Sequence, residues 1–443
     1  MINEPIIALA TPPLKSALAV IRLTGEGVFE LTDTLFSKKV SGVNSRSVLV
    51  GNLSIEGRLI DEVVLLVYPG PNSMTGEDVV EICCHGSMVI VNEIIEAYLS
   101  KGVRYATAGE FSSRAFYHGK MDLIEAEAVN DLINATTKEA KNVALLSLSG
   151  KTSELVGPLR EEISSLLALV EVGIDFPEYD EEETATGEVI VESCKKIRAR
   201  LERLIAEGEQ GKVYQDGVRV AIVGEPNVGK SSILNALLEQ DKAIVSSIPG
   251  TTRDVVEGQI SIHGVPVFLW DTAGIRSSDD ELEQLGVERT KKSIEEADLV
   301  LFVTVNGAPS NQKERELLQS VSGKPVLRVY NKSDLNDAPA SDGVTISAKE
   351  KDVEALKEAM FELLGISPSA CQIPSLNNAR ELAILRQIEE DIAFVERSAA
   401  EGEAIDLLSV YLQSAYNKTR ELLGEDITHD LTDEIFSRFC VGK

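Results

Sequence analysis

Short apolar runs and turn residues dominate the first part of the chain. Runs of strand length occupy residues 6–9, 17–23 and 63–67, with prolines and glycines between them. Residues 93–98 have the spacing of a helix. Brief strands bounded by turns and combined with a helix are typical of an α+β fold. We therefore predict an α+β domain over residues 1–119.

The next part of the chain has the pattern of long amphipathic helices. Apolar residues recur every three or four positions, as they do from Ile124 to Leu132, and prolines are scarce. Such spacing places the apolar side chains on one helix face. We predict a helical domain over residues 120–215, broken at the acidic residues 175–183 by an exposed loop. The same pattern predicts a second helical part over residues 372–443.

Strand-like and helical segments alternate between the two helical parts. The strand-like runs are residues 218–223, 265–270, 299–304, 326–330 and 344–347, and the helical stretches include residues 231–238 and 285–297. Such alternation predicts a mostly parallel sheet with helices on both faces. Because helical segments stand on both sides of it, we predict that this α/β domain, residues 216–371, is inserted into the helical domain.

Composition excludes several classes of protein. The chain has 443 residues, with 43 Lys and Arg against 72 Asp and Glu, which gives a net charge of −29. This charge disfavours global attraction to nucleic acid. The five cysteines are scattered and include no Cys-x-x-Cys pair, which argues against a disulfide scaffold and a structural zinc site. Without a leader-like N-terminus or a long apolar stretch, we predict a cytoplasmic protein with no membrane span.

A phosphate-binding loop follows the first strand of the inserted domain. Residues 224–231 match the pattern G-x-x-x-x-G-K-[ST] at every position and open a predicted helix. The loop amides and the helix N-terminus would bind phosphate oxygens. Lys230 would reach the β- and γ-phosphates, and the hydroxyl of Ser231 would bind Mg²⁺.

Three further elements follow at the ends of later strands. Residues 271–274 read Asp-Thr-Ala-Gly, in which Asp271 would meet the Mg²⁺ shell. Residues 331–334 read Asn-Lys-Ser-Asp, and the carboxylate of Asp334 can accept the N1 and amine protons of guanine, which adenine does not offer there. Ser347 to Lys349 would contact the guanine oxygen. Because open α/β sheets bind ligands at the carboxyl ends of their strands, these elements together predict a GTP site.

The residues that we predict to contact GTP come from these four elements. They are Asn227, Val228, Gly229, Lys230, Ser231, Ser232, Asp271, Thr272, Ala273, Gly274, Asn331, Lys332, Asp334, Ser347 and Ala348.

The residues themselves leave the catalytic group for hydrolysis open. Ile275 follows the Asp-Thr-Ala-Gly element, and an aliphatic side chain cannot orient water as glutamine does in Ras-like proteins. Carboxylates within residues 277–283 are candidates. Arg253 and Arg276 are candidates for stabilising the charge that develops on the leaving oxygen.

A monovalent cation is an alternative to an arginine. The side-chain oxygen of Asn227 could bind one, and backbone carbonyls of residues 246–254 could complete its shell. Thr251 or Thr252 would supply the Mg²⁺ ligand of the mobile loop. Arginine and cation remain two open alternatives on the residues alone.

Motifs spread over nearly the whole chain resemble the MnmE (TrmE) family of bacterial tRNA-modification GTPases. The GTPase motifs above, with Pro-Gly-Thr-Thr-Arg-Asp at 249–254, carry part of the resemblance. The remainder comes from Ala8–Pro13, Thr75–Asp78, Gly109–Phe116, His118–Asp122, Glu125–Ala128 and the terminal Phe-Cys-Val-Gly-Lys at 439–443.

This resemblance implies a K⁺-stimulated GTPase that forms a homodimer through its N-terminal domain. With a flavoprotein partner, MnmG (GidA), in a heterotetramer, it would modify carbon 5 of the wobble uridine of certain tRNAs to an aminomethyl or carboxymethylaminomethyl type. The one-carbon unit would come from a tetrahydrofolate derivative, 5-formyl- or methylene-tetrahydrofolate.

It also implies roles for individual residues. Asn227, Ser246, Ile248 and Thr251 would hold K⁺, and Ser231, Thr252 and Asp271 would hold Mg²⁺. Glu283 would orient the attacking water, with Thr251, Thr252 and Arg253 beside it. Arg22, Glu81, Lys120 and Lys443 would bind the folate, and the thiol of Cys440 is a candidate nucleophile.

Two other functions remain alternatives. One is a regulatory GTPase switch whose N-terminal domain only captures a protein, and the folate and Cys-x-Gly-Lys residues argue against it. The other is a ribosome-assembly GTPase, which the net charge of −29 and the lack of a basic RNA-binding appendage disfavour.

Overall fold

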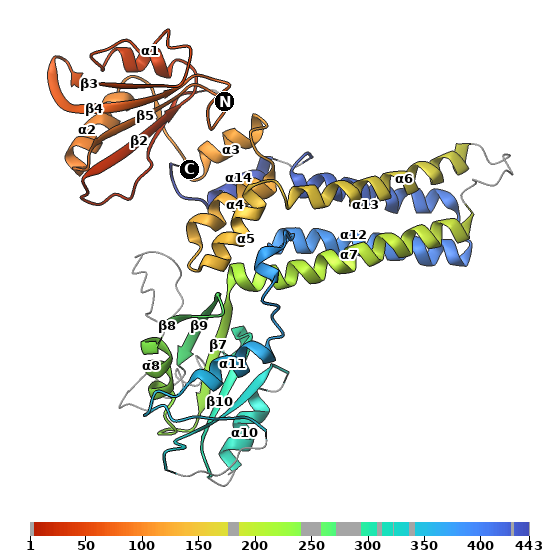
Figure 1. Ribbon diagram of the computed structural model, residues 1–443. Coiled ribbons are helices and arrows are strands. Elements are labelled where there is room, and N and C mark those ends of the chain that lie inside the picture. The colour runs from red at the N-terminus through yellow and green to blue at the C-terminus, as the bar shows by residue number, and fades with distance from the viewer. Residues whose placement is uncertain are drawn as a thin grey trace, which may run out of the picture. The chain divides into compact units, whose positions relative to one another are not determined.

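The computed structural model describes residues 4–175, 186–240, 258–271, 294–307, 312–321, 323–335, 342–426 and 429–442. By their contacts the residues form two compact units, residues 1–130 with 413–443 and residues 131–412. The first unit contains one six-stranded sheet and the second contains another. Figure 1 shows both sheets and the helices of each unit.

The first unit is an α+β fold with a mainly antiparallel sheet. Its strands are β1 (Ile6–Leu9), β2 (Leu18–Thr24), β3 (Ser47–Ile55), β4 (Arg58–Tyr68), β5 (Val79–His85) and β6 (Arg104–Tyr105), in the order β3-β4-β5-β2-β1-β6. Only β1 and β6 run parallel. Ile7, Ile21, Leu65 and Ile82 of the sheet are fully buried, together with Tyr98 of α2.

Helices from both ends of the chain complete this unit. They are α1 (Val28–Asp33), α2 (Met88–Leu99), α3 (Glu110–Tyr117) and α14 (His429–Ser437), with parts of α4 (Leu123–Asn134) and α13 (Ile405–Leu423). Phe436 and Phe439 near the C-terminus pack against Ala126 and Phe116. The C-terminal residues are therefore built into the N-terminal fold.

The second unit begins with a helical bundle. It contains α5 (Lys138–Leu148), η1 (Ser153–Leu155), α6 (Val156–Asp175), α7 (Gly187–Asp216) and α12 (Ala379–Glu401). α12 runs antiparallel along α7, because Gly187 at one end approaches the carbonyl of Ala399 and Gly208 at the other approaches that of Leu376. Asn378 and Glu381 form a capping box that starts α12.

The α/β part of the second unit follows α7. Its strands are β7 (Val218–Gly224), β8 (Gly258–Ile262), β9 (Val265–Asp271), β10 (Leu299–Val305), β11 (Val326–Asn331) and β12 (Val344–Thr345), in the order β12-β11-β10-β7-β9-β8. All neighbours are parallel except β8 and β9. The associated helices are α8 (Lys230–Gln240), α10 (Gln312–Ser320), α11 (Glu354–Leu363) and η2 (Ala370–Gln372).

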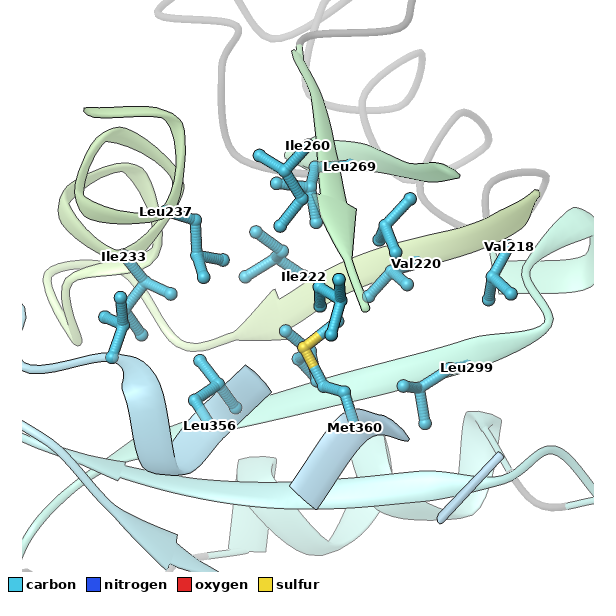
Figure 2. Close-up of a cluster of buried hydrophobic side chains, with 14 of the residues drawn as sticks. Val218, Val220, Ile222, Ile233, Leu237, Ile260, Leu269, Leu299, Leu356 and Met360 are labelled. Carbon is cyan, nitrogen blue, oxygen red and sulfur yellow. The ribbon is translucent and has the colours of Figure 1, made fainter. Parts of the chain in front are cut away.

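Alternate residues of β7 enter two different cores. Val218, Val220 and Ile222 point toward α8 and α11, where Leu237 and Met360 meet them (Figure 2). Ala221 and Val223 enter the core on the opposite face with Phe302 of β10. This burial on both faces explains the near-continuous apolar run in the strand.

The predicted fold class is confirmed in all three of its parts. The strand expected at residues 344–347 is shorter, because β12 ends at Thr345. β3 is absent from the prediction because it is an edge strand on which Val48 and Val50 are exposed, so its apolar residues give no buried run. The acidic segment 176–183 and most of the helix expected at 285–297 lie outside the described residues. Within the described ranges, no helix is both long and apolar enough to cross a membrane.

A buried ionic network fastens α3 to the first sheet. Glu110 accepts hydrogen bonds from Arg104 at 3.0 Å, from Arg114 at 3.0 Å and from the backbone of Thr107 at 2.9 Å. The side chain of Arg114 is only 3% exposed and also pairs with Glu77. Burial by itself raises the pKa of Glu110, but these donors outweigh it and lower the pKa to about 2.

We expect Glu110→Gln to destabilise the first unit in a pH-dependent way. The folded-state pKa of Glu110 lies below its ordinary value of 4.5, so its contribution is complete above that pH and is lost as pH falls toward 2. The expected cost at pH 7 is on the order of 1–3 kcal/mol. Hydrogen exchange of the β1 amides measures it, and the difference from the unsubstituted protein should shrink at pH 3.

Glu4→Gln is the matched control for this substitution. Glu4 also pairs with Arg104, but its side chain is 43% exposed, and exposed ion pairs contribute little. Equal effects of the two substitutions, or an effect of Glu110→Gln that does not change with pH, would contradict the assignment.

Candidate functional site

The loop between β7 and α8 has the backbone of a phosphate-binding loop. β7 ends at Gly224, where a Cβ atom would lie 2.3 Å from the carbonyl oxygen of Val303 on β10. The chain then passes through Asn227 (φ +65°) and Gly229 (φ +103°) before α8 begins at Lys230. The left-handed backbone at these two positions turns successive amides toward one side, as a phosphate cradle requires.

Lys230 lies at the centre of this loop. Its side chain is buried and its Nζ donates to the carbonyl oxygens of Gly224 at 2.8 Å and Glu225 at 2.9 Å. Phosphate oxygens are stronger acceptors for an ammonium group than carbonyls are. The ammonium group is therefore held where phosphate oxygens can replace the two carbonyls as its hydrogen-bond acceptors.

Asn331 joins the phosphate loop to the loop after β12. Its Nδ2 donates to the carbonyl of Val228 at 2.9 Å, and its Oδ1 accepts from the backbone of Ala348 at 3.1 Å. The residue is only 2% exposed. A Cβ atom on Gly229 would lie 2.2 Å from this Nδ2, so only glycine fits beside the Asn331 amide.

The next two functional residues lie on the same edge of the sheet. Lys332 (φ +66°) donates from Nζ to the carbonyl of Asn227 at 2.8 Å, a second link to the phosphate loop. Asp334 accepts from the hydroxyl of Ser347 at 3.0 Å, and its side chain is 12% exposed. The carboxylate is thus oriented beside Ser347 and Ala348, the backbone expected to face guanine.

The structure brings together the described part of the predicted GTP site. β9 ends at Asp271 in register with Ile222 of β7, so its carboxyl end lies next to the phosphate loop. The other predicted residues of this site lie outside the described residues, namely Ser246, Ile248, Thr251, Thr252, Arg253, Thr272, Ala273, Gly274, Arg276 and Glu283.

A second cluster lies on the sheet of the first unit and includes the C-terminal tail. Arg22 and Glu81 are register partners on β2 and β5. The guanidinium of Arg22 donates to Oε1 of Glu81 at 2.8 Å and to the carbonyl of Gly442 at 2.9 Å, and it lies 5.7 Å from the ring centre of Phe111. Arg22 therefore binds the tail and the sheet at once.

The tail carries the exposed cysteine of the chain. Val441 forms a β-bridge with Ala108, and the backbone of Gly109 donates to the carbonyl of Cys440 at 3.3 Å. All five cysteines lie in described segments, and Cys440 alone is exposed. Burial raises the pKa of the Cys84 thiol to about 11, so the geometry favours Cys440 over Cys84 as a reactive group.

Lys120 lies in the same unit, where a Cβ atom on Gly76 would be 3.2 Å from its Cε. It lines a pocket formed by residues 116–125 and 423–425, and neither Arg22 nor Glu81 lines that pocket. Burial raises the pKa of Glu125 in the pocket wall. Lys443, the remaining predicted folate residue, lies outside the described residues.

A mostly parallel sheet with a phosphate loop, a buried lysine and the Asn-Lys-Ser-Asp element at one edge defines a P-loop GTPase. Two family models match the chain, "GTP-binding protein TrmE N-terminus" over residues 5–120 and "MnmE helical domain" over residues 123–440. The chain belongs to the MnmE family of tRNA modification GTPases.

Full-length relatives support this assignment. The tRNA modification GTPase MnmE of Ligilactobacillus salivarius is 40% identical over 99% of this chain and 98% of its own length. The protein of that name from Lactiplantibacillus plantarum is 39% identical over 99% and 98%, and that from Bacillus cytotoxicus is 38% identical over 99% of both chains. The resemblance found from the sequence motifs is thereby confirmed.

Sequence reasoning missed what some of these residues bind. It assigned Asn331 and Lys332 to GTP, whereas in the structure both also tie loops of the protein together. It gave no role to Arg114 or Thr24, which share the buried network of Glu77. Glu77 lies in the Thr75–Asp78 motif, which the sequence shows, but the sequence does not show that Thr24 and Arg114 bind Glu77.

We expect Asn331→Ala to weaken binding of both GTP and GDP by roughly 10- to 100-fold. The substitution removes two buried hydrogen bonds between loops, each worth about 1–3 kcal/mol when a partner is left unsatisfied. Titration with a fluorescent guanine nucleotide measures the Kd.

Lys332→Met is the comparison for this prediction, because Lys332 also bonds the phosphate loop but through an exposed side chain. Its effect should be below about fivefold. Unchanged affinity in Asn331→Ala would refute the proposed linkage of the two loops.

Proposed function

We propose that this protein is a K⁺-stimulated GTPase that modifies carbon 5 of the wobble uridine of certain tRNAs, to an aminomethyl or carboxymethylaminomethyl type. It would act as a homodimer formed through the N-terminal domain, with the flavoprotein MnmG in a heterotetramer, in the cytoplasm. The observation that carries the proposal is that two clusters of polar side chains lie in two different units. One is the edge of the second sheet that carries the phosphate loop and Lys230, which we call the nucleotide edge. The other is the cluster in which Arg22 holds the C-terminal tail at Gly442, two residues after Cys440.

The donors at the nucleotide edge suit Mg²⁺ and K⁺. The hydroxyl of Ser231 and the carboxylate of Asp271 are hard oxygen ligands of the kind that Mg²⁺ prefers. Asn227 has an amide oxygen and a left-handed backbone in the loop that would surround the β- and γ-phosphates. A bound K⁺ would supply positive charge there in place of an arginine. When GTP binds, Lys230 exchanges the carbonyls of Gly224 and Glu225 for phosphate oxygens.

The cluster at Arg22 suits the pterin edge of a tetrahydrofolate derivative. Oε1 of Glu81 is bonded by Arg22, which leaves Oε2 to accept from the amide and amine edge of a pterin. Because Arg22 also holds the carbonyl of Gly442, two residues after Cys440, the tail is held at the arginine that pairs with this carboxylate. A one-carbon donor bound there would lie near an exposed thiol, the arrangement that nucleophilic chemistry requires.

The net charge bears on where tRNA binds. At −29 the chain repels polyanions overall. Much of the basic tRNA-binding surface would therefore belong to the flavoprotein. Tight tRNA binding by this chain alone at physiological salt would count against that part of the proposal.

We expect GTP hydrolysis to be at least tenfold faster in KCl than in NaCl at equal ionic strength, because K⁺ replaces an arginine in stabilising the transition state. Asn227→Ala should lose most of this stimulation and keep its nucleotide affinity within a few-fold. Phosphate release by the purified chain measures the rates.

Lys230→Ala is the reference for complete loss of function at this site, and it should lower hydrolysis in both salts. Equal rates of the unsubstituted protein in KCl and NaCl would rule out the K⁺ site and point back to Arg253 or Arg276.

We expect Gly442→Ala to weaken binding of 5-formyltetrahydrofolate by about tenfold while GTP hydrolysis without folate stays unchanged. Gly442 has φ +90°, and a Cβ atom there would lie 2.7 Å from the carbonyl oxygen of Leu9. The tail must therefore shift away from the sheet. Equilibrium binding of the folate to the purified chain measures the effect.

Gly102→Ala is a closely matched control. Gly102 lies in the same unit at φ +91°, but nothing lies within 4 Å of its added Cβ atom. It imposes the same backbone strain without moving the tail. Equal folate affinity of the two variants would show that the tail does not contribute to the folate site.

A further inference from the structure

The chain returns from the GTPase part to the helical bundle along α7. We call residues 364–378, which connect α11 to α12, the return segment. Gly208 and Gly211 of α7 are three residues apart and so lie on one face of that helix. A Cβ atom on Gly208 would lie 2.1 Å from the carbonyl oxygen of Leu376. The return segment therefore touches the backbone of α7 itself.

Two polar side chains of the return segment are buried in this contact. Ser375 is 3% exposed and Asn377 is 5% exposed. Among the described residues, neither Oγ of Ser375 nor Nδ2 of Asn377 has a hydrogen-bond partner. A buried hydroxyl or amide without a hydrogen bond costs free energy, and the large majority of such groups in folded proteins are bonded. The two atoms therefore point to a ligand that lies outside the polypeptide.

Both atoms face the same position beside α7. A Cβ atom on Gly211 would lie 2.3 Å from Oγ of Ser375 and 3.4 Å from Nδ2 of Asn377. One small molecule can bridge two atoms that are this close to a common point, because each of its hydrogen bonds spans about 2.8–3.0 Å. A side chain at position 211 would collide with the hydroxyl. We call the space bounded by these three residues the Gly211 site.

The chemistry of the two atoms limits what the Gly211 site can bind. The amide nitrogen of Asn377 only donates hydrogen bonds, and the hydroxyl of Ser375 can donate as well. The ligand must therefore be small and must offer lone pairs. A water oxygen accepts two hydrogen bonds, and buried waters commonly have two to four polar partners. A chloride ion could accept both bonds too, but burial of an anion beside neutral donors is costly.

A cavity opens next to the Gly211 site. Its volume is about 210 Å³, and its lining includes Gln210 of α7 and Ile373 of the return segment. Gln210 directly precedes Gly211, and Ile373 lies two residues before Ser375. Contact between α7 and the return segment is thus open enough at this level to admit water.

We propose that the Gly211 site binds one ordered water, which accepts hydrogen bonds from Ser375 and Asn377. This water bridges the two side chains where the chain re-enters the helical bundle after the GTPase part. It stabilises the contact of the return segment with α7. The water site requires no K⁺, folate or partner protein, so its test and the tests of the proposed function have separate outcomes.

A high-resolution crystal structure of the full chain tests the site directly. One density peak within about 2.6–3.2 Å of both Oγ of Ser375 and Nδ2 of Asn377 is expected. Absence of a peak between the two atoms would overturn the proposal, and so would a bond from either atom to another protein group.

The variant Ser375→Ala has opposite effects with and without the water. With the water bound, the substitution removes one of its partners, and amide exchange of peptides containing Gly208 and Gly211 should become about 3- to 10-fold faster. Without it, the substitution removes an unsatisfied buried hydroxyl, and exchange should become slower. Hydrogen exchange of the full chain followed by mass spectrometry measures the change. Slower or unchanged exchange would refute the water site.

A second variant tests whether the two side chains share one molecule. Asn377→Leu should also speed exchange, because it removes the other donor. The double variant should show less than the product of the two single effects, since either substitution already breaks the bridge. Effects that simply multiply would show that no molecule is shared.

Ser367→Ala is the matched control for Ser375→Ala. Ser367 lies in the same return segment, but its Oγ is already bonded to that of Ser369 at 3.0 Å. Its substitution should leave exchange at the Gly211 site unchanged. The effect of Ser375→Ala should be equal in chloride and in acetate at equal ionic strength, and dependence on chloride would show that the ion is bound instead of water. GTP hydrolysis should be the same in every variant, which shows that the chain is folded.

Discussion

The antiparallel pairing of α7 with α12 is the contact on which the second unit depends. The chain leaves the helical bundle at the end of α7, builds a complete parallel sheet and must then return to the same bundle. The return is possible because the returning chain lies very close to α7. A Cβ atom on Gly208 would lie 2.1 Å from the carbonyl of Leu376, and one on Gly211 would lie 2.3 Å from the hydroxyl of Ser375. Beyond these glycines, Arg198 pairs with both Glu389 and Glu396 across the two helices. The entry and exit of the GTPase part are thus fixed side by side, which lets the bundle remain one body with an insertion in it.

Cations held by backbone carbonyls are common to both functional clusters. Lys230 is bonded to the carbonyls of Gly224 and Glu225, Lys332 to that of Asn227, and Arg22 to that of Gly442. In a chain with net charge −29, a basic side chain near a ligand site has many carboxylates as rival partners. The carbonyl oxygens that hold Lys230 and Lys332 give up these cations to a phosphate more readily than a carboxylate would, whereas Arg22 is also paired with the carboxylate of Glu81. The network around Glu110 is the opposite case, because there buried charges pair with each other and serve structure.

Most of the nucleotide edge could be predicted because its chemistry is local. A phosphate loop needs glycines, a lysine and a hydroxyl at fixed spacing, and the chain shows them at residues 224–231. The role of Asp334 could be predicted because guanine offers N1 and amine protons that a carboxylate can accept. Parallel strands place their carboxyl ends on one edge, so the order of motifs along the chain already implied one site. Tail docking could not be predicted in this way, since Arg22 and Gly442 are 420 residues apart and no local pattern links them.

The sequence by itself determined the alternation of segments, the phosphate loop, the guanine-specific aspartate and the family to which the chain belongs, because each depends on residues close together in the chain. The tertiary structure alone decided that Asn331 bonds the phosphate loop to Ala348 and that Arg22 is shared between Glu81 and the tail. These features arise where distant segments bury polar groups together. A buried donor must find an acceptor wherever packing supplies one, and only the folded chain fixes which acceptor that is.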